Sequence, residues 1–315
     1  MIGVGNFART VLLPSLKSVP NCRLHTIATQ RGISAEHTQQ SFGFEFSAAD
    51  EAAVLDNDEI NAVLITTPHS SHASLTAAAL AKGKNVLVEK PLALDRDELN
   101  DVIAARNASD AFFQIGFNRR FAPMAVAMRD RLAALPSPSV LLLRVNAGQL
   151  PAESWQNAPE EGNGRILGEV CHFIDLARFL IGSPIKSVQA AAAETIRGAC
   201  DDLTATLGFA DGSLATIAYT AKGDTAFSKE LFEAYAGGTV AVIDNFRKLT
   251  IIADGKEKKS GGLDQDKGHK GELTAFVEAV AKGGPAPVDE GELIESSLAT
   301  IAVGEALRSG QPVTF

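Results

Sequence analysis

The first third of the chain alternates short apolar, β-prone runs with helical patterns, and this alternation constrains the fold more than any other feature. The predicted strands are 24–29, 62–66, 85–88 and 112–116, and the predicted helices are 8–19, 34–42, 71–82 and 96–107. Strands that alternate with helices of this length indicate βαβ units and a parallel sheet. We therefore expect a parallel α/β domain over residues 1–120.

The pattern changes after residue 120, where strands follow one another directly. Helices are predicted at 124–135, 168–181, 270–281 and 290–308, and strands at 140–146, 187–194, 203–209, 214–219, 231–235, 239–243 and 249–252. Glycines at 212, 238 and 255 stand where hairpin turns require positive φ. Residues 121–315 are thus expected to form an α+β domain with a mainly antiparallel sheet, and the polar segments 256–262 and 265–270 to be mobile loops.

Composition excludes several classes of partner. The 315 residues, 45% of them hydrophobic, are enough for two modest cores, and 29 basic against 38 acidic residues leave no basic surface for nucleic acid. No apolar run approaches the roughly 20 residues of a membrane span, and no basic-then-apolar leader precedes Gly3. Cys22, Cys171 and Cys200 are widely spaced, which is typical of reduced thiols. We expect a cytoplasmic protein without membrane or nucleic-acid partners.

A glycine fingerprint stands at the very start, in the segment 3–8 (Gly-Val-Gly-Asn-Phe-Ala). Gly3 and Gly5 allow a tight turn and close approach of a pyrophosphate, while Ala8 permits close helix packing. Asn6, Phe7 and the amides at the start of the predicted helix 8–19 can bind the anion. The alternative is a glycine turn with no ligand.

The end of the next predicted strand bears on the choice of dinucleotide. An acidic residue there would bind the ribose 2′-hydroxyl of NAD, but the segment 28–31 contains none. Thr29 and Arg31 can instead hold a 2′-phosphate. The pattern favours NADP over NAD, and a solvated Arg31 is the alternative.

Lys90 lies in Glu89-Lys90-Pro91, immediately after the predicted strand 85–88. Ligands of a parallel α/β sheet collect at the carboxyl ends of its strands, so Lys90 and the glycine turn should face one crevice. Pro91 restricts the backbone of Lys90 and so aims its side chain. Beside a nicotinamide such a lysine can act as an acid or base, although a solvated cation is the simpler interpretation.

Thr67, Pro68 and His72 follow the strand 62–66 and open the next helix. Thr67 and Pro68 can line the cofactor, and His72 can point toward it. Because His69 and His72 lie three residues apart, a metal site is one alternative, but no third ligand is near in sequence. A hydrogen bond from His72 to the Glu89–Pro91 turn is favoured over a metal.

Glu169, His172 and Asp175 recur every third residue on a predicted helix that follows a glycine-rich loop containing Arg165. Side chains at this spacing lie near one helical face, where an acid can fix the tautomer of His172 and raise its basicity. We predict His172 as a proton-transfer residue with Glu169 or Asp175 orienting it. A purely structural His–Asp pair is the alternative.

Four further residues are candidate substrate ligands. Asn118 and Arg119 end the first domain, where a substrate hydroxyl or acidic group can be met, although salt bridges across the domain boundary explain Arg119 and Arg120 almost as well. Trp155 lies in a polar loop and can stack on a sugar ring or anchor the loop. Arg165 completes this set.

Together these patterns resemble the Gfo/Idh/MocA oxidoreductase family over nearly the whole chain. The resemblance implies an N-terminal Rossmann domain with a doubly wound parallel sheet, an open-sheet C-terminal domain through which homo-oligomers form, bound NAD or NADP, and a sugar or cyclitol substrate. It also implies that Lys90 is the catalytic lysine and His172 the helix histidine. The acid that the family has one turn before this histidine is replaced here by Gly168, with Glu169 next to it as a substitute.

The expected activity is hydride transfer between a nicotinamide and a carbinol carbon of a sugar, nucleotide sugar or cyclitol. A non-catalytic dinucleotide or sugar sensor is one alternative. A truncated, inactive module of a longer polypeptide is another, because only Met1 and Ile2 precede Gly3 where a strand averages about five to six residues. Either the first strand is short or Met1 is an internal start.

Overall fold

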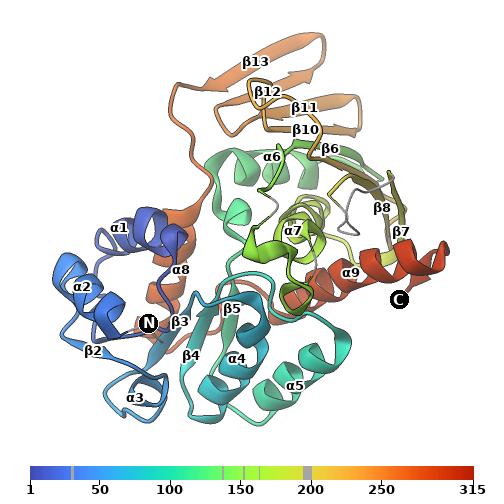
Figure 1. Ribbon diagram of the computed structural model, residues 1–315. Coiled ribbons are helices and arrows are strands. Elements are labelled where there is room, and N and C mark those ends of the chain that lie inside the picture. Colours follow the sequence, from blue (N-terminus) through green and yellow to red (C-terminus); the bar gives the residue numbers. More distant parts are fainter. Residues whose placement is uncertain (30–31, 137, 152, 163, 194–200) are drawn as a thin grey trace. The chain divides into compact units, whose positions relative to one another are not determined.

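The computed structural model describes residues 1–29, 32–136, 138–151, 153–162, 164–193 and 201–315. These residues form two compact units (Figure 1). The first comprises Met1–Phe117 and His269–Ile294, and the second Asn118–Gly268 and Glu295–Phe315. The first unit runs to Phe117, and the segment 269–294 returns to it later in the chain.

The first unit contains a parallel sheet. Its strands are β1 (Thr26–Ala28), β2 (Phe46–Ala48), β3 (Ala62–Ile65), β4 (Asn85–Val88) and β5 (Phe113–Ile115). β1 pairs with β2, and β3 with β4 and β4 with β5, all in parallel. Ile2 joins the two groups because it bridges to Ala28 on one side and Ile65 on the other. The strand between β1 and β3 is therefore little more than Ile2 itself.

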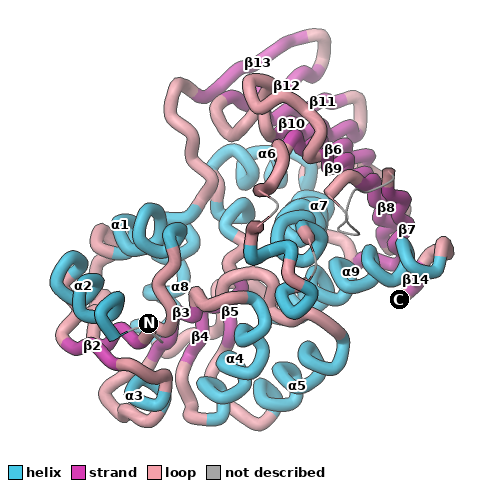
Figure 2. Tube along the Cα trace, in the orientation of Figure 1, coloured by secondary structure: helices cyan, strands magenta, loops and turns pink. Residues whose placement is uncertain are grey.

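Helices alternate with these strands as the sequence predicts. They are η1 (Ala8–Leu12), α1 (Leu13–Leu16), α2 (Gly32–Phe42), α3 (Ala52–Leu55), η2 (His69–Ser71), α4 (His72–Ala81) and α5 (Arg96–Asn107). Pro14 lies in the first turn of α1, directly after the π-helical turn η1. Asp95 caps α5 by accepting a 2.9 Å hydrogen bond from the Glu98 amide. α4 and α5 lie side by side (Figure 2).

Helix α8 (His269–Lys282) explains why the first unit takes back a late segment of the chain. Its buried Leu273 and Phe276 belong to one apolar cluster with Leu12 and Leu13 from the first helix. α8 lies beside α1 (Figure 1). Its apolar face thus completes the core of the first unit, which a purely sequential division at residue 120 does not anticipate.

The second unit is built on a nine-stranded sheet. Its strands are β6 (Val140–Asn146), β7 (Ile185–Ala192), β8 (Leu203–Phe209), β9 (Leu214–Thr220), β10 (Glu230–Ala236), β11 (Thr239–Asp244), β12 (Lys248–Ala253), β13 (Lys256–Gly261) and β14 (Val313–Thr314). They lie in the order β13-β12-β11-β10-β6-β9-β8-β7-β14. Only the β6–β9 pair is parallel among these described strands. The expected mainly antiparallel sheet is confirmed.

The hairpin turns also follow the sequence prediction. Gly212, Gly238 and Gly255 have φ of +85°, +72° and +69°, in the left-handed region that glycine adopts without strain. The segment 256–262, however, was expected to be a mobile loop, and that prediction is wrong. It contains the edge strand β13, whose six residues are all exposed and are held by antiparallel pairing with β12.

Helices cover one face of this sheet. Buried residues of α6 (Pro123–Ala133), α7 (Cys171–Ile181) and α9 (Glu290–Ser309) form one apolar cluster with the inward side chains of the strands. Alternate residues of β6, such as Val140 and Leu142, point to the other face and are 45% and 42% exposed. In the described part of the chain, no helix has the length and apolar character needed to span a membrane.

Candidate functional site

The glycine turn lies at the carboxyl end of the short central strand of the first unit. Gly3 donates to the Ala28 carbonyl at 2.9 Å and has a φ of +83°. A Cβ on Gly3 would lie 2.8 Å from the Thr67 amide nitrogen, so only glycine fits. Apart from its chain neighbours, no atom of the described residues lies within 4 Å of a Cβ built on Gly5, which leaves open space beside the backbone.

The helix that follows this turn starts at Asn6 and Phe7, while Ala8 is 1% exposed and packs into the core. An open glycine turn that leads into a helix N-terminus suits a pyrophosphate, because amides and the helix dipole face the anion. These residues therefore fit the dinucleotide that the sequence predicts. Phe7 also contacts the ring of His269, 5.6 Å away between centroids.

The segment after β3 is tied to the glycine turn. The Thr66 hydroxyl donates to the Gly3 carbonyl at 2.9 Å, and the Ser71 hydroxyl donates to the Thr67 hydroxyl at 2.7 Å. Thr67 and Pro68 thus lie next to the predicted pyrophosphate site. Their contact with a cofactor stays a prediction.

His72 braces two neighbouring loops. Its Nδ1 lies 2.7 Å from the Pro91 carbonyl oxygen, and its Nε2 lies 2.9 Å from the Thr67 carbonyl oxygen. The predicted hydrogen bond between His72 and the Glu89–Pro91 turn is confirmed. Since both ring nitrogens face backbone carbonyls and the residue is 1% exposed, His72 ties together the loops that carry Thr67 and Lys90. A contact between His72 and the cofactor stays a prediction.

Lys90 lies two residues beyond the end of β4, at the same edge of the sheet as the glycine turn, and its peptide bond to Pro91 is cis. Its neighbour Glu89 is anchored through its amide, which donates to the Ile65 carbonyl at 2.9 Å. Burial raises the pKa of the Glu89 carboxyl to about 7, against the opposing effect of the Lys90 charge. A carboxyl that titrates near neutrality therefore stands next to the predicted catalytic lysine.

Gly116, which directly follows β5, makes room for this carboxyl and was not singled out from the sequence. A Cβ on Gly116 would lie 2.9 Å from Glu89 Oε1. A glycine immediately after an apolar strand was the available signal, since it indicates close approach of another group.

The ribose end of the predicted site is only partly described. Thr29 follows β1, and its amide donates to the Ala48 carbonyl at 3.2 Å. Arg31 lies outside the described residues. Arg9, which the sequence reasoning missed, donates to the Ser34 hydroxyl at 2.6 Å and so brings a guanidinium to the start of α2.

In the second unit, Glu169 and His172 lie on consecutive helical segments, η6 (Ile166–Val170) and α7. His172 is 8% exposed. Glu169 accepts a 3.2 Å hydrogen bond from the Tyr219 hydroxyl and lies 3.8 Å from the Lys229 ammonium. The Arg165 guanidinium donates to the same hydroxyl at 3.3 Å and to the Gly148 carbonyl at 2.7 Å.

Tyr219, which joins Arg165 and Glu169, was missed from the sequence. Burial, followed by the charge of Glu169, raises the pKa of the Tyr219 hydroxyl, so it stays a protonated donor. It is one of two tyrosines and occupies an inward position of β9, where a buried hydroxyl requires a partner. That position was the available signal.

The remaining predicted residues make contacts within the second unit. Asp175 is fully buried; Arg120 Nε lies 2.8 Å from each of its oxygens, and the Ser296 hydroxyl lies 3.2 Å from one. Arg119 donates to Glu230 at 2.7 Å, and the Asn118 amide to the Lys267 carbonyl at 2.7 Å. The salt bridges expected as an alternative for the arginines are present, but inside this unit.

Substrate contacts of Asn118 and Arg119, and orientation of His172 by Asp175, stay predictions. Trp155 opens the short helix η4 (Trp155–Asn157) and is 52% exposed, which leaves much of its indole uncovered. Among the described residues, no three histidine, cysteine, aspartate or glutamate side chains group as metal ligands. The structure thus gathers the predicted cofactor residues in the first unit and Arg165, Glu169 and Tyr219 in the second.

Comparison with known proteins identifies the family. Residues 1–117 match an oxidoreductase family with an NAD-binding Rossmann fold, GFO_IDH_MocA, and residues 140–230 match the GFO/IDH/MocA C-terminal domain. The chain belongs to the GFO/IDH/MocA oxidoreductase family. Its Rossmann unit and its open-sheet unit are the two domains of that family.

Relatives of this family match the chain over nearly its full length. Inositol 2-dehydrogenase of Rhizobium meliloti is 27% identical over 96% of this chain and 94% of its own. The 1,5-anhydro-D-fructose reductase of Ensifer adhaerens is 26% identical over 99% and 96%. A solved structure of levoglucosan dehydrogenase with NADH and levoglucosan shares the fold, with a TM-score of 0.87 at 20% identity and coverage of 99% and 97%.

The predicted family, the fold class and the assignment as an oxidoreductase of the dehydrogenase and reductase type are confirmed. The predicted reaction class, on CH–OH groups, matches that of the named relatives. The alternatives of a non-catalytic sensor or a truncated inactive module have no support among them. An NAD-binding fold is shown for residues 1–117, whereas a preference for NADP is not.

Proposed function

We propose that this GFO/IDH/MocA protein transfers a hydride reversibly between NAD(H) and a carbinol carbon of a sugar, nucleotide sugar or cyclitol. The observation that carries the proposal is the position of Lys90, at the same sheet edge as the open Gly3–Gly5 turn. His72 braces its loop against the Thr67 segment. The relatives named for inositol and anhydrofructose support a polyol substrate.

The residues divide the work between binding and proton transfer. Gly3, Gly5 and the helix start would hold the pyrophosphate, and Thr67 and Pro68 would flank the nicotinamide, which supplies hydride chemistry when bound. Lys90 Nζ would hydrogen-bond the reacting oxygen of the substrate. In oxidation the hydroxyl proton would leave that oxygen for Lys90 and pass to the His172 ring, with Glu169 or Asp175 orienting the ring.

Arg165, Asn118, Arg119 and Trp155 are the proposed substrate ligands. Arg165 and Glu169 are held by Tyr219, so they offer a charged donor and a charged acceptor in fixed positions. A polyol presents hydroxyls that need both kinds of partner. Trp155 would stack on the apolar face of the ring.

We propose NAD(H) as the coenzyme and acceptance of NADP(H) as well. Support for NAD(H) is the family of the first unit. Support for NADP(H) is the absence of an acidic residue in the segment 28–31, together with Arg9 at the start of α2. Titration of the protein with NADH and with NADPH decides between them. A cytoplasmic location likewise stays a prediction.

A homo-oligomer formed through the sheet of the second unit is also proposed. Tyr235 pairs with Val140, and Val140 with Leu214, so these three side chains form one row across β10, β6 and β9. They are 38%, 45% and 47% exposed. A second copy of the chain would cover this apolar row.

The decisive experiment replaces the lysine. Lys90→Met keeps the length of the side chain and removes its ammonium, so kcat on an active polyol should fall by about 10²–10⁴-fold. Substrates are screened among inositols, anhydro sugars and aldoses by NADH absorbance. The affinity for NADH, measured by fluorescence, should change by no more than about threefold, since Lys90 is assigned to the reacting oxygen.

Lys82→Met is the matched control, because Lys82 is an exposed residue that pairs with Asp56 on the surface. Its activity should equal that of the parent. Turnover of Lys90→Met within a few-fold of the parent, on a substrate that the parent oxidises, would remove Lys90 from the mechanism.

A further inference from the structure

The side chain of Glu89 is fixed at the carboxyl edge of the sheet in the first unit, where parallel α/β sheets bind their ligands. Its amide donates to the Ile65 carbonyl of β3 at 2.9 Å. On the other side, the Gly116 amide donates to the Val88 carbonyl at 2.8 Å. A Cβ on Gly116 would lie 2.9 Å from Glu89 Oε1 and 3.0 Å from Oε2. The whole carboxyl group therefore packs against the backbone that follows β5.

Lys90 is the charged group that acts on this carboxyl in the part of the chain that the structure describes. Burial raises the pKa of the carboxyl to about 7, while the charge of Lys90 and a hydrogen bond from the Lys90 amide oppose that rise. On the side of α4, both ring nitrogens of His72 lie against backbone carbonyls. The segments 66–68 and 116–117, which follow β3 and β5, carry no charge. A further cation at this edge would therefore change the ionisation of the carboxyl strongly.

A buried glutamate in the second unit shows the effect of nearby cations. Burial alone would raise the pKa of Glu230, but the charges of Arg119 and Lys267 outweigh it and lower the pKa to about 2. Both cations lie within 3.0 Å of one carboxylate oxygen. Glu89 has a pKa of about 7 beside Lys90 alone. The two glutamates thus differ in their cationic partners, and a new cation should move Glu89 toward the ionised form.

The nicotinamide ring of the coenzyme carries a positive charge when it is oxidised and none when it is reduced. A positive charge near a buried carboxyl favours the carboxylate, whereas a neutral ring only excludes water and so favours the acid. The carboxyl should therefore respond to the oxidation state of the coenzyme. This response rests on the proposed function, which puts the nicotinamide beside Thr67 and Pro68, next to the loop that holds Glu89.

We propose that Glu89 releases its proton when NAD⁺ binds and holds a proton when NADH binds, so that ring and carboxyl together have the same net charge in both oxidation states. When NAD⁺ binds, the carboxylic O–H bond breaks and the proton passes to the solvent. When NADH binds, the acid stays protonated, and a carboxylate takes up a proton from the solvent. Glu89 is thus a titrating group of the coenzyme site, distinct from the proposed substrate ligands.

Isothermal titration calorimetry of the parent protein tests this coupling. Each coenzyme is titrated at pH 7 in phosphate and in Tris, whose ionisation enthalpies differ, so the difference in heat gives the number of protons exchanged. With a pKa of about 7, about half of the Glu89 carboxyls are protonated before binding. NAD⁺ should release up to about half a proton, and NADH should take up as much as about half a proton.

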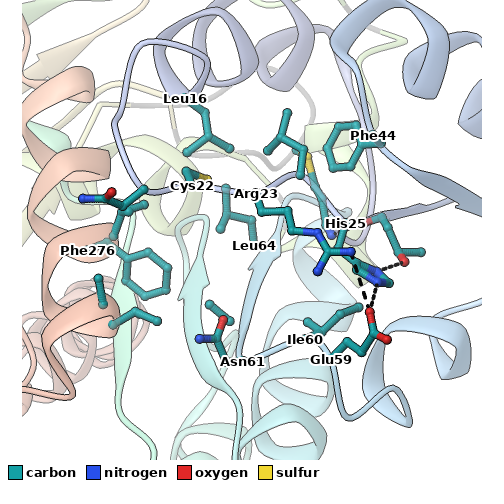
Figure 3. A pocket seen from close by; sticks show the side chains of 18 of the residues that line it. Leu16, Cys22, Arg23, His25, Phe44, Glu59, Ile60, Asn61, Leu64 and Phe276 are labelled. Atoms are coloured by element: carbon teal, nitrogen blue, oxygen red, sulfur yellow. Dashed lines mark hydrogen bonds and ion pairs between the residues drawn. The ribbon is translucent and has the colours of Figure 1, made fainter.

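Glu89→Gln keeps the shape of the side chain and removes its titration, so the two coenzymes should exchange equal numbers of protons. Glu59→Gln is the matched control. Glu59 lines a cavity of about 520 Å³ at the opposite edge of the same sheet, where β1 and β3 begin. Its carboxylate lies 3.7 Å from Arg23 and 3.1 Å from His25, as Figure 3 shows. The control should keep the proton numbers of the parent.

The pH dependence of the two affinities gives a second readout. NAD⁺ should bind the ionised form of Glu89 more tightly, and NADH the protonated form. The ratio of the NADH dissociation constant to the NAD⁺ dissociation constant should therefore rise by roughly tenfold from pH 6 to pH 8 in the parent. Binding is measured by calorimetry for NAD⁺ and by fluorescence for NADH. In Glu89→Gln the ratio should stay constant with pH.

Three results would contradict the coupling. Equal proton numbers for NAD⁺ and NADH in the parent would overturn it and leave the proposed function intact. A difference that persists in Glu89→Gln but vanishes in Lys90→Met would also overturn it, because Lys90 would then be the source of the proton. Failure of both coenzymes to bind would overturn the proposed function, and the coupling with it.

Discussion

Glu89 shows how one buried carboxyl couples the predicted site to pH. Burial raises its pKa from the ordinary 4.5 to about 7, so the folded protein holds this proton more tightly than the unfolded chain does. Such a group makes the free energy of unfolding fall as the pH rises from about 4.5 to about 7. Above about pH 7 the carboxylate is charged in both the folded and the unfolded state, and burial of this charge lowers the free energy of unfolding by its full amount.

Glu89→Gln removes this titration. Relative to the variant, the parent should lose stability at a rate approaching about 1.4 kcal/mol per pH unit inside the window. Urea unfolding of both proteins at several pH values measures the difference. Below about pH 4 the carboxyl becomes protonated in both the folded and the unfolded state, so the difference between the unfolding free energies of parent and variant should level off. Parallel curves from pH 4 to pH 8 would contradict the assignment.

The accuracy of sequence reasoning at single residues depended on whether the signal was local. The glycine turn and the contact of His72 with the Glu89–Pro91 turn follow from neighbours in sequence or from strand ends that meet at one edge. The partner of Glu169 did not, because Tyr219 lies 50 residues away on a strand. The Arg119–Glu230 pair spans 111 residues and was equally out of reach.

Three elements of the second unit meet in one buried ion cluster. Glu230 starts β10, Arg119 lies on the short helix η3 (Asn118–Phe121), and Lys267 precedes α8. Both cations lie within 3.0 Å of Glu230 Oε1. Burial alone would raise the pKa of Glu230, but the charges of Arg119 and Lys267 outweigh it and lower the pKa to about 2.

Glu230→Gln should therefore destabilise the second unit by about 3–5 kcal/mol at pH 7, because it leaves two cations without their buried counter-charge. Urea unfolding measures this loss. A carboxyl with a lowered pKa contributes its full stabilisation above about pH 4.5. The difference in the free energy of unfolding between parent and variant should therefore become smaller as the pH falls toward 2. Glu233→Gln, which lies on the other face of β10, should stay within about 0.5 kcal/mol of the parent. A similar loss from both variants would argue against the cluster.

Periodicity predicted elements with a regular apolar pattern well, and very short or polar elements poorly. β4, β6, β8 and α5 have the predicted bounds because their apolar patterns are regular. β2 and β14 contain only three and two residues, and β13 is entirely polar. Such strands form because the neighbouring strand supplies the backbone hydrogen bonds. Lysine side chains, as in β13, are common in exposed edge strands.

At the scale of the whole molecule, the apolar row Tyr235–Val140–Leu214 makes association testable. Val140→Lys places a charge in the centre of the row and should shift the mass measured by light scattering from an oligomer toward the 33.1 kDa chain. Leu263→Lys changes a side chain that is 89% exposed outside the sheet, and should leave the mass unchanged. A parent that is monomeric at every concentration would contradict the proposed oligomer.

The two units divide the chain after Phe117 and again around α8. The first boundary coincides with a change from alternating to consecutive strands, which the sequence displays. The segment 269–294 packs in the first unit because the core of that unit has room for an apolar helix. This is a property of the folded unit and is not visible in the sequence of the segment itself. The apolar stripe formed by Leu273, Phe276 and Val277 predicts an amphipathic helix but not its partner. Only the structure shows that this stripe packs with Leu12 and Leu13.

This late helix has a consequence for synthesis on the ribosome. The first unit is encoded first, yet its apolar layer stays open until α8 has emerged, some 150 residues after Phe117. Contacts between segments so far apart in sequence form slowly, because the intervening loop must close first. During translation, the apolar surface of the nascent Rossmann unit therefore stays exposed to solvent until α8, which is translated near the end of the chain, packs against it.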